Sequence, residues 1–172
     1  MGRIISIVNQ KGGVGKTTTA INLAAAVGNK GKRCLLVDLD PQGNATSGVG
    51  VDKRQVRLST YELLIGEAGF ADVRLSTGFR GLDVLPCSIR LAGAEVELVE
   101  MDRRKNRLLA ALAPAREEYD YLFIDCPPSL GLLTLNALCA SDTVLVPIQP
   151  EYFALEGLSQ LMGTVRRIKQ QD

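Results

Sequence analysis

Residues 9–18 read Asn-Gln-Lys-Gly-Gly-Val-Gly-Lys-Thr-Thr, a glycine-rich segment whose residue types suit the binding of a phosphate group. Because Gly12, Gly13 and Gly15 carry no Cβ, the backbone there can take positive φ values and turn its N–H groups toward an anion. Lys16 can reach the β- and γ-phosphates of a nucleotide, and the hydroxyl of Thr17 is placed to bind Mg²⁺. The segment therefore predicts a loop that binds a nucleoside triphosphate.

The segment lies between a predicted strand and a predicted helix, as a phosphate-binding loop requires. Residues 3–8 form a short β-branched run, typical of a strand that is buried on both faces of a parallel sheet. Apolar residues then recur at helical spacing from Lys16 until Gly28 and Gly31 end the helix. This order favours a nucleotide site over a surface turn, although Gln10 stands where the general Walker A pattern has its first glycine.

Short apolar strands alternate with helical segments along the rest of the chain, which predicts a doubly wound, mostly parallel α/β sheet. The further strands are expected at 33–37, 82–85, 121–124 and 143–146. The further helices are expected at 60–65, 94–101, 106–113, 132–139 and 154–168. Since there is neither an internal repeat nor a low-complexity linker, we expect one P-loop domain over 1–172.

Three aspartates follow predicted strands, at the sheet edge where such folds bind their ligands. Asp125 ends the strand Tyr-Leu-Phe-Ile and fits a carboxylate that holds the Mg²⁺ shell, usually through water. The alternative for Asp125 is a cap of the following Pro-Pro turn. Asp38 and Asp40 close the second strand two residues apart, so in an extended backbone they point the same way.

Composition restricts the class of protein. A chain of 172 residues with 46% hydrophobic content has enough apolar side chains for a proper core, and its formal charge of +1 predicts no global basic field. No apolar stretch approaches the ~20 residues of a membrane span, and the first apolar run is too short for a signal peptide, so we expect a cytoplasmic protein.

Four scattered cysteines and no histidine argue against a zinc site or a disulfide framework.

Three segments resemble one known family. The run Lys-Gly-Gly-Val-Gly-Lys-Thr-Thr at 11–18 is similar to the deviant Walker A motif of the ParA/MinD ATPases. The segments 37–46 (Val-Asp-Leu-Asp-Pro-Gln-Gly-Asn-Ala-Thr) and 125–138 (Asp-Cys-Pro-Pro-Ser-Leu-Gly-Leu-Leu-Thr-Leu-Asn-Ala-Leu) resemble the chromosome- and plasmid-partitioning branch, ParA of the Soj type. The resemblance implies ATP and Mg²⁺ as cofactors, with nucleotide contacts from Lys11, Gly12, Gly13, Val14, Gly15, Lys16, Thr17 and Thr18.

The resemblance also implies roles for single residues. Lys11 would reach the partner's ATP across a nucleotide-sandwiched homodimer and stabilise charge on the transferring phosphoryl group, as an arginine finger does. Lys16 would act beside it, and Asp40 would position or polarise the attacking water. Thr17, Asp125 and Asp38 would lie at or near the magnesium. Some relatives hold an iron–sulfur cluster between subunits, but the favoured role of Cys126 is a small buried residue at a strand end.

The implied function is an ATPase switch whose dimer binds DNA non-specifically and whose slow turnover a ParB-like partner accelerates. The loops at 42–50 and 127–131 would order with ATP and relax after hydrolysis. Basic runs at 103–105 and 166–169 are candidate DNA contacts, with solvated helix ends as the favoured alternative. The family's DNA contacts and part of its adenine pocket lie beyond residue 172, so the chain is interpreted as truncated.

Truncation has a physical consequence, because it would leave the strand at 143–148 as an exposed apolar edge that promotes self-association. Two other functions stay open at this point. One is a MinD-like membrane-cycling ATPase that places the division site. The other is a nucleotide-binding fragment that no longer hydrolyses ATP.

Overall fold

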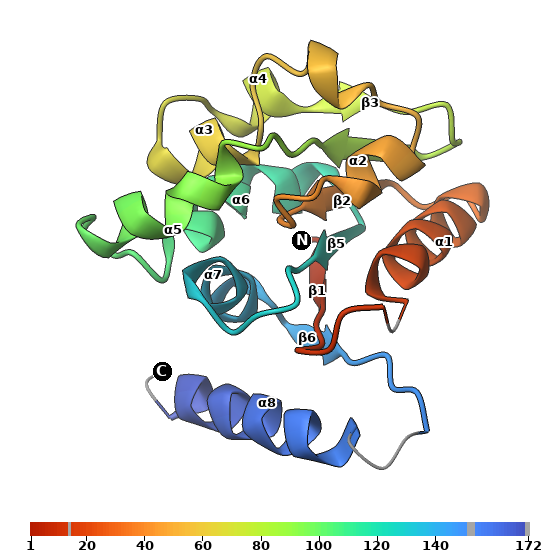
Figure 1. Ribbon diagram of the computed structural model, residues 1–172. Coiled ribbons are helices and arrows are strands. Elements are labelled where there is room, and N and C mark those ends of the chain that lie inside the picture. The colour runs from red at the N-terminus through yellow and green to blue at the C-terminus, as the bar shows by residue number, and fades with distance from the viewer. Residues whose placement is uncertain (14, 151–153, 171–172) are drawn as a thin grey trace.

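The computed structural model describes residues 1–13, 15–150 and 154–170. Its centre is a six-stranded sheet with the order β3-β4-β2-β5-β1-β6 (Figure 1). The strands are β1 (Arg3–Ile7), β2 (Cys34–Asp38), β3 (Leu75–Ser76), β4 (Leu82–Leu85), β5 (Tyr121–Asp125) and β6 (Thr143–Leu145). All neighbouring pairs are parallel except β3 and β4, which are antiparallel. The predicted doubly wound, mostly parallel sheet is therefore confirmed.

The helices of the described chain cover both faces of this sheet (Figure 1). They are α1 (Lys16–Asn29), α2 (Asn44–Gly48), α3 (Thr60–Ile65), α4 (Phe70–Val73), α5 (Leu91–Val99), α6 (Arg107–Glu118), α7 (Leu132–Ala140) and α8 (Ala154–Lys169), with a 3₁₀ turn at Lys53–Gln55. Among these helices none combines the length and apolar character needed to cross a bilayer.

Two separate cores follow from the alternation of side chains along the buried strands. In β2, Leu35 and Val37 join the core beneath α3, α5, α6 and α7, whereas Cys34 and Leu36 join the core beneath α1 and α2. Every residue of β2 is buried, as expected for a strand covered on both faces. Burial on both faces fixes the register of the central strands, because a slip by one residue would exchange the two sets of side chains.

The structure corrects two sequence predictions and adds two short elements. The segment 42–50 was expected to be a loop, but it contains α2, because Ala45 and Val49 pack into the core beside α1. Helix α6 was expected to end at 113, yet it continues through Pro114 to Glu118, since Ala115 is buried on the same face as the preceding turn. The short elements α4 and β3 were not predicted at all, because four and two residues carry too little periodicity to be recognised.

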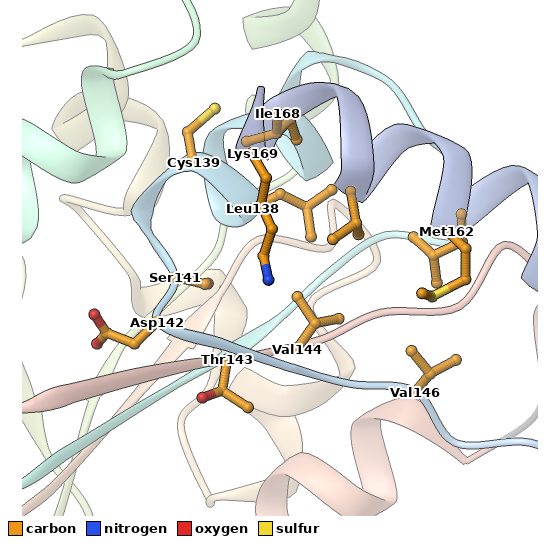
Figure 2. Close-up of a pocket in the computed structure, with 12 residues that line it drawn as sticks. Leu138, Cys139, Ser141, Asp142, Thr143, Val144, Val146, Met162, Ile168 and Lys169 are labelled. Carbon is orange, nitrogen blue, oxygen red and sulfur yellow. The ribbon is translucent and has the colours of Figure 1, made fainter. Parts of the chain in front are cut away.

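Strand β6 lies at the edge of the sheet, as predicted for this segment, and pairs only with β1 within the described chain. A cavity of about 480 Å³ lies between β6, the end of α7 and α8 (Figure 2). Its wall includes Leu138, Val144 and Met162, which Figure 2 shows around one hollow. This apolar hollow lies beside the sheet edge and takes no residue from the phosphate loop.

Candidate functional site at the ends of β1, β2 and β5

The residues predicted to bind nucleotide and magnesium lie together where three adjacent strands end. Strand β5 lies between β1 and β2, and Asp125 pairs in register with both Ile7 and Asp38. The glycine-rich loop follows β1 directly and leads into α1 (Figure 1). Parallel strands therefore bring residues 11–18, 38–40 and 125 to one edge of the sheet, the edge at which open α/β folds bind ligands.

The loop backbone has the geometry of an anion cradle. Gly13 and Gly15 take φ values of 73° and 85°, in the left-handed region that favours glycine. Gly15 is the N-cap of α1 and offers no side-chain cap, so the first N–H groups of the helix are left to another acceptor. A Cβ added at Gly12, Gly13 or Gly15 would meet no atom within 4 Å, so this stretch borders open space. Such a helix N-terminus suits a phosphate group.

The two lysines of the loop lie in different environments. Lys16 is only 6% exposed, and its Nζ donates a hydrogen bond to the backbone carbonyl of Lys11 at 3.2 Å. Lys11 itself is exposed, and its backbone N–H donates to Asn9 Oδ1 at 3.0 Å. Thr18 is exposed on the first turn of α1, and Val14 lies outside the described residues. Lys16 is thus held against the loop, whereas Lys11 lies at its surface.

Thr17 and Asp125 are in direct contact. The Thr17 hydroxyl donates to Asp125 Oδ2 at 2.7 Å, which joins the start of α1 to the end of β5. Asp125 is fully buried, and its Oδ1 has no hydrogen-bond partner among the described residues. Burial raises the pKa of Asp125 to about 7, and the charges of Asp38 and Asp40 add to this, while the Thr17 hydroxyl and Lys16 oppose it.

Asp38 is a buried acceptor for the next helix. Its Oδ2 accepts hydrogen bonds from the backbone N–H and the hydroxyl of Thr46, at 2.8 and 2.6 Å, and its Oδ1 accepts from the Asp40 N–H at 3.1 Å. Burial raises the pKa of Asp38 to about 6, although these hydrogen bonds partly counteract the shift. Asp38 therefore fixes α2 and the 38–40 turn relative to β2.

Asp40 is the last residue of the 38–40 turn and is 8% exposed. Its Oδ1 accepts a hydrogen bond from the Gln42 N–H at 3.0 Å, and its backbone carbonyl accepts one from the Cys87 thiol at 3.0 Å. The Cys87 N–H donates to the Thr46 hydroxyl at 2.9 Å. Sequence reasoning missed both Thr46 and Cys87, because neither residue type indicates such a contact and no spacing rule links them to Asp40.

The arrangement fits a bound Mg²⁺ together with a nucleotide. No group of three or more acidic, cysteine or histidine side chains within the described residues could hold a metal alone. Mg²⁺ is usually bound through one or two carboxylates plus phosphate oxygens and waters, so a complete protein cage is not required. The unpartnered Asp125 Oδ1 and the adjacent Thr17 hydroxyl supply the expected oxygen atoms. A cation there would also offset the three clustered carboxylates.

Known proteins of similar sequence cover nearly all of this chain. A protein-family model described as an AAA domain matches residues 2–172. The sporulation initiation inhibitor protein Soj of Bacillus subtilis is 57% identical over 169 residues, covering 98% of this chain and 67% of that protein. The chromosome partitioning protein ParA of Myxococcus xanthus is 57% identical, covering 99% of this chain and 60% of that protein.

A solved structure has the same fold as this chain. A cobyrinic acid a,c-diamide synthase from Mycobacterium smegmatis, crystallised with an ATP analog and magnesium, superposes with a TM-score of 0.94 at 42% identity. The match covers 99% of this chain and 69% of that one. The chain thus spans about two thirds of the length of the proteins it resembles.

Proposed function

We propose that this chain, which belongs to the Soj and ParA family of P-loop ATPases, binds Mg–ATP at the ends of β1, β2 and β5 and acts as an ATP-driven switch in chromosome or plasmid partitioning. The observation that carries the proposal is the hydrogen bond from Thr17 to the buried Asp125 beside the open glycine loop. That contact supports the proposal, because a nucleotide-bound magnesium takes oxygen ligands such as a hydroxyl and a carboxylate.

Each residue of the site has a defined task in this mechanism. The N–H groups of residues 12–18 bind the phosphates at the start of α1, and Lys16 neutralises their charge. Thr17 and Asp125 would hold the Mg²⁺, which when bound supplies charge stabilisation to the transferring phosphoryl group. Asp40 orients the attacking water, and Asp38 keeps the 38–40 turn in place through Thr46.

The switch itself requires a second copy of the chain. Lys11 is an exposed residue of the phosphate loop, and the family resemblance gives the matching lysine a role toward a facing subunit. We infer an ATP-dependent homodimer in which Lys11 of each subunit reaches the phosphates bound by the other, so that each active site is complete only in the dimer. This dimer would bind DNA non-specifically on the nucleoid, and a ParB-like activator would accelerate its slow hydrolysis. The names of the relatives support this partitioning role.

Binding of a fluorescent, non-hydrolysable ATP analog with and without Mg²⁺ tests the proposed site. Thr17→Ala should remove most of the gain in affinity that Mg²⁺ provides, because it deletes the hydroxyl beside Asp125. Thr19→Ala is the matched control, since Thr19 lies two residues further along α1 and its hydroxyl makes no hydrogen bond to another described residue. Equal Mg²⁺ dependence in both variants would contradict the assigned magnesium site. Release of inorganic phosphate from ATP then tests turnover separately.

A further inference from the structure

Helix α7 begins immediately after the loop 127–131, and its own residues do not cap it. The N-cap position is Gly131, which has no side chain to accept a hydrogen bond from the first helical N–H groups. An uncapped helix start is less stable than one whose N–H groups are satisfied. The loop that precedes it follows Asp125 directly, so the order of this helix start bears on the proposed magnesium site.

A carboxylate from another helix supplies the missing cap. Glu95 of α5 accepts a hydrogen bond from the Leu133 N–H through Oε1 at 3.2 Å. Figure 1 shows α5 and α7 next to one another, and the two helices are in contact. Leu133 is the second residue of α7, whose N–H an ordinary N-cap side chain would accept. A negative charge at this place is also favoured by the helix dipole.

Gly131 leaves room for this carboxylate. A Cβ at position 131 would overlap Glu95, lying 2.8 Å from its Cδ and 3.0 Å from its Oε2. The φ of Gly131 is −77°, which any residue adopts, so a side chain at 131 would act by displacing the Glu95 carboxylate and not through backbone strain. Glu95 and Gly131 therefore form a matched pair. The described chain gives Glu95 no salt bridge that would offer its carboxylate another role.

The same short segment contacts the other loop of the site at its opposite end. Cys87 donates its backbone N–H to the Thr46 hydroxyl and its thiol to the Asp40 carbonyl. Residues 87–95 thus contact the segment 38–46, which includes Asp40, at one end. At the other end they contact the start of α7, just after the loop 127–131. We propose that Glu95 is a positioning residue that caps α7 from α5, and that residues 87–95 couple the order of the segment 38–46 to that of the loop 127–131.

Amide hydrogen exchange tests the capping part in the nucleotide-free chain. Glu95→Ala should speed exchange at the start of α7 by about fivefold, the effect of losing one N-cap. Exchange in β1 and β5 should stay unchanged. Glu95→Gln keeps an acceptor oxygen and should stay close to the parent chain. The matched control is Glu100→Gln, which removes an exposed carboxylate next to the end of α5 and should change nothing.

A second substitution makes the test specific to the cap. Gly131→Ala alone should speed exchange at the start of α7, because its Cβ displaces the Glu95 carboxylate and alanine brings no acceptor of its own. In the Glu95→Ala background, Gly131→Asp should restore protection, because the new aspartate takes the N-cap position and no longer meets a carboxylate. Protection therefore follows the presence of an acceptor at the helix start. If Glu95→Ala speeds exchange uniformly, or if Gly131→Asp fails to restore protection in that background, the capping role is wrong.

The coupling part rests on the proposed function and has its own readout. Mg–ATP analog should protect both 40–50 and 127–135 in the parent chain, and Glu95→Ala should reduce the protection of 40–50 although the hydrogen bond that it removes goes to Leu133. Full protection of 40–50 in Glu95→Ala would overturn the coupling. If the parent chain gains no protection from nucleotide, the proposed function fails, while the exchange results without nucleotide still decide the capping role.

Discussion

Replacing Asp125 with asparagine should remove most of the pH dependence of this chain's stability between pH 5 and pH 7. Burial raises the pKa of Asp125 to about 7, well above the value of 3.8 expected for an exposed aspartate. Over most of this range the folded state keeps a proton on Asp125 that the unfolded chain has lost. The stabilisation is therefore complete at low pH and is lost as the pH rises through 7.

The size of the effect follows from the one proton by which the folded and unfolded states differ. One bound proton changes the free energy of unfolding by about 1.4 kcal/mol per pH unit, and the folded state has lost half of this proton at pH 7, so Asp125 accounts for a loss of about 2.3 kcal/mol from pH 5 to pH 7. Asp38, with a pKa raised by burial to about 6, adds a smaller loss of roughly 1 kcal/mol between pH 5 and pH 6. The chain contains no histidine, so the residue type that usually titrates in this window is absent.

Urea denaturation at pH 5, 6 and 7 measures these free energies for the parent chain and for Asp125→Asn. The asparagine keeps an oxygen that can accept the Thr17 hydrogen bond, so the variant preserves that contact while it removes the titrating group. We expect a loss of about 3.5 kcal/mol in the parent chain and of about 1 kcal/mol in the variant. If the parent chain shows no loss, or if both proteins lose stability equally, the carboxylate is not buried as described.

Three further predictions concern the loop, the catalytic turn and the sheet edge. Gly15→Ala should lower the free energy of unfolding by about 1 kcal/mol because its φ is 85°, whereas Gly12→Ala, free of that constraint, should not; urea denaturation compares the two. Asp40→Ala should slow phosphate release and prolong the ATP-bound dimer, and unchanged turnover would exclude Asp40 as the water-positioning group. Thr143→Lys, at an exposed position of β6, should reduce self-association in sedimentation velocity across protein concentrations, and unchanged association would show that β6 does not mediate it.

The phosphate loop and the two sheet-end carboxylates could be predicted because their information is local. Glycines beside Lys16 specify a backbone shape through residue type alone, and an aspartate that ends an apolar strand lies at the ligand edge of any such sheet. The structure places Gly13 and Gly15 in the left-handed region and brings Thr17 to Asp125, in agreement with that reasoning.

The residues that support the site could not be predicted, because their contacts depend on tertiary structure. Cys87 meets the Asp40 carbonyl across 47 residues of sequence, and Glu95 meets Leu133 across 38. Neither spacing is a helix or strand period. Helix α2 was missed for a similar reason, since the Gly- and Ser-rich composition of 42–50 indicates a loop, while burial of Ala45 against α1 outweighs that preference.

The central claim is an ATP-dependent switch completed by Lys11 from a second subunit. Sedimentation equilibrium of this chain with Mg–ATP, with Mg–ADP and without nucleotide, alongside Lys11→Ala, tests it most directly. The account predicts dimers only with Mg–ATP in the parent chain and monomers under all three conditions in the variant. A monomer–dimer balance that ignores the nucleotide, or that Lys11→Ala leaves unchanged, would contradict it.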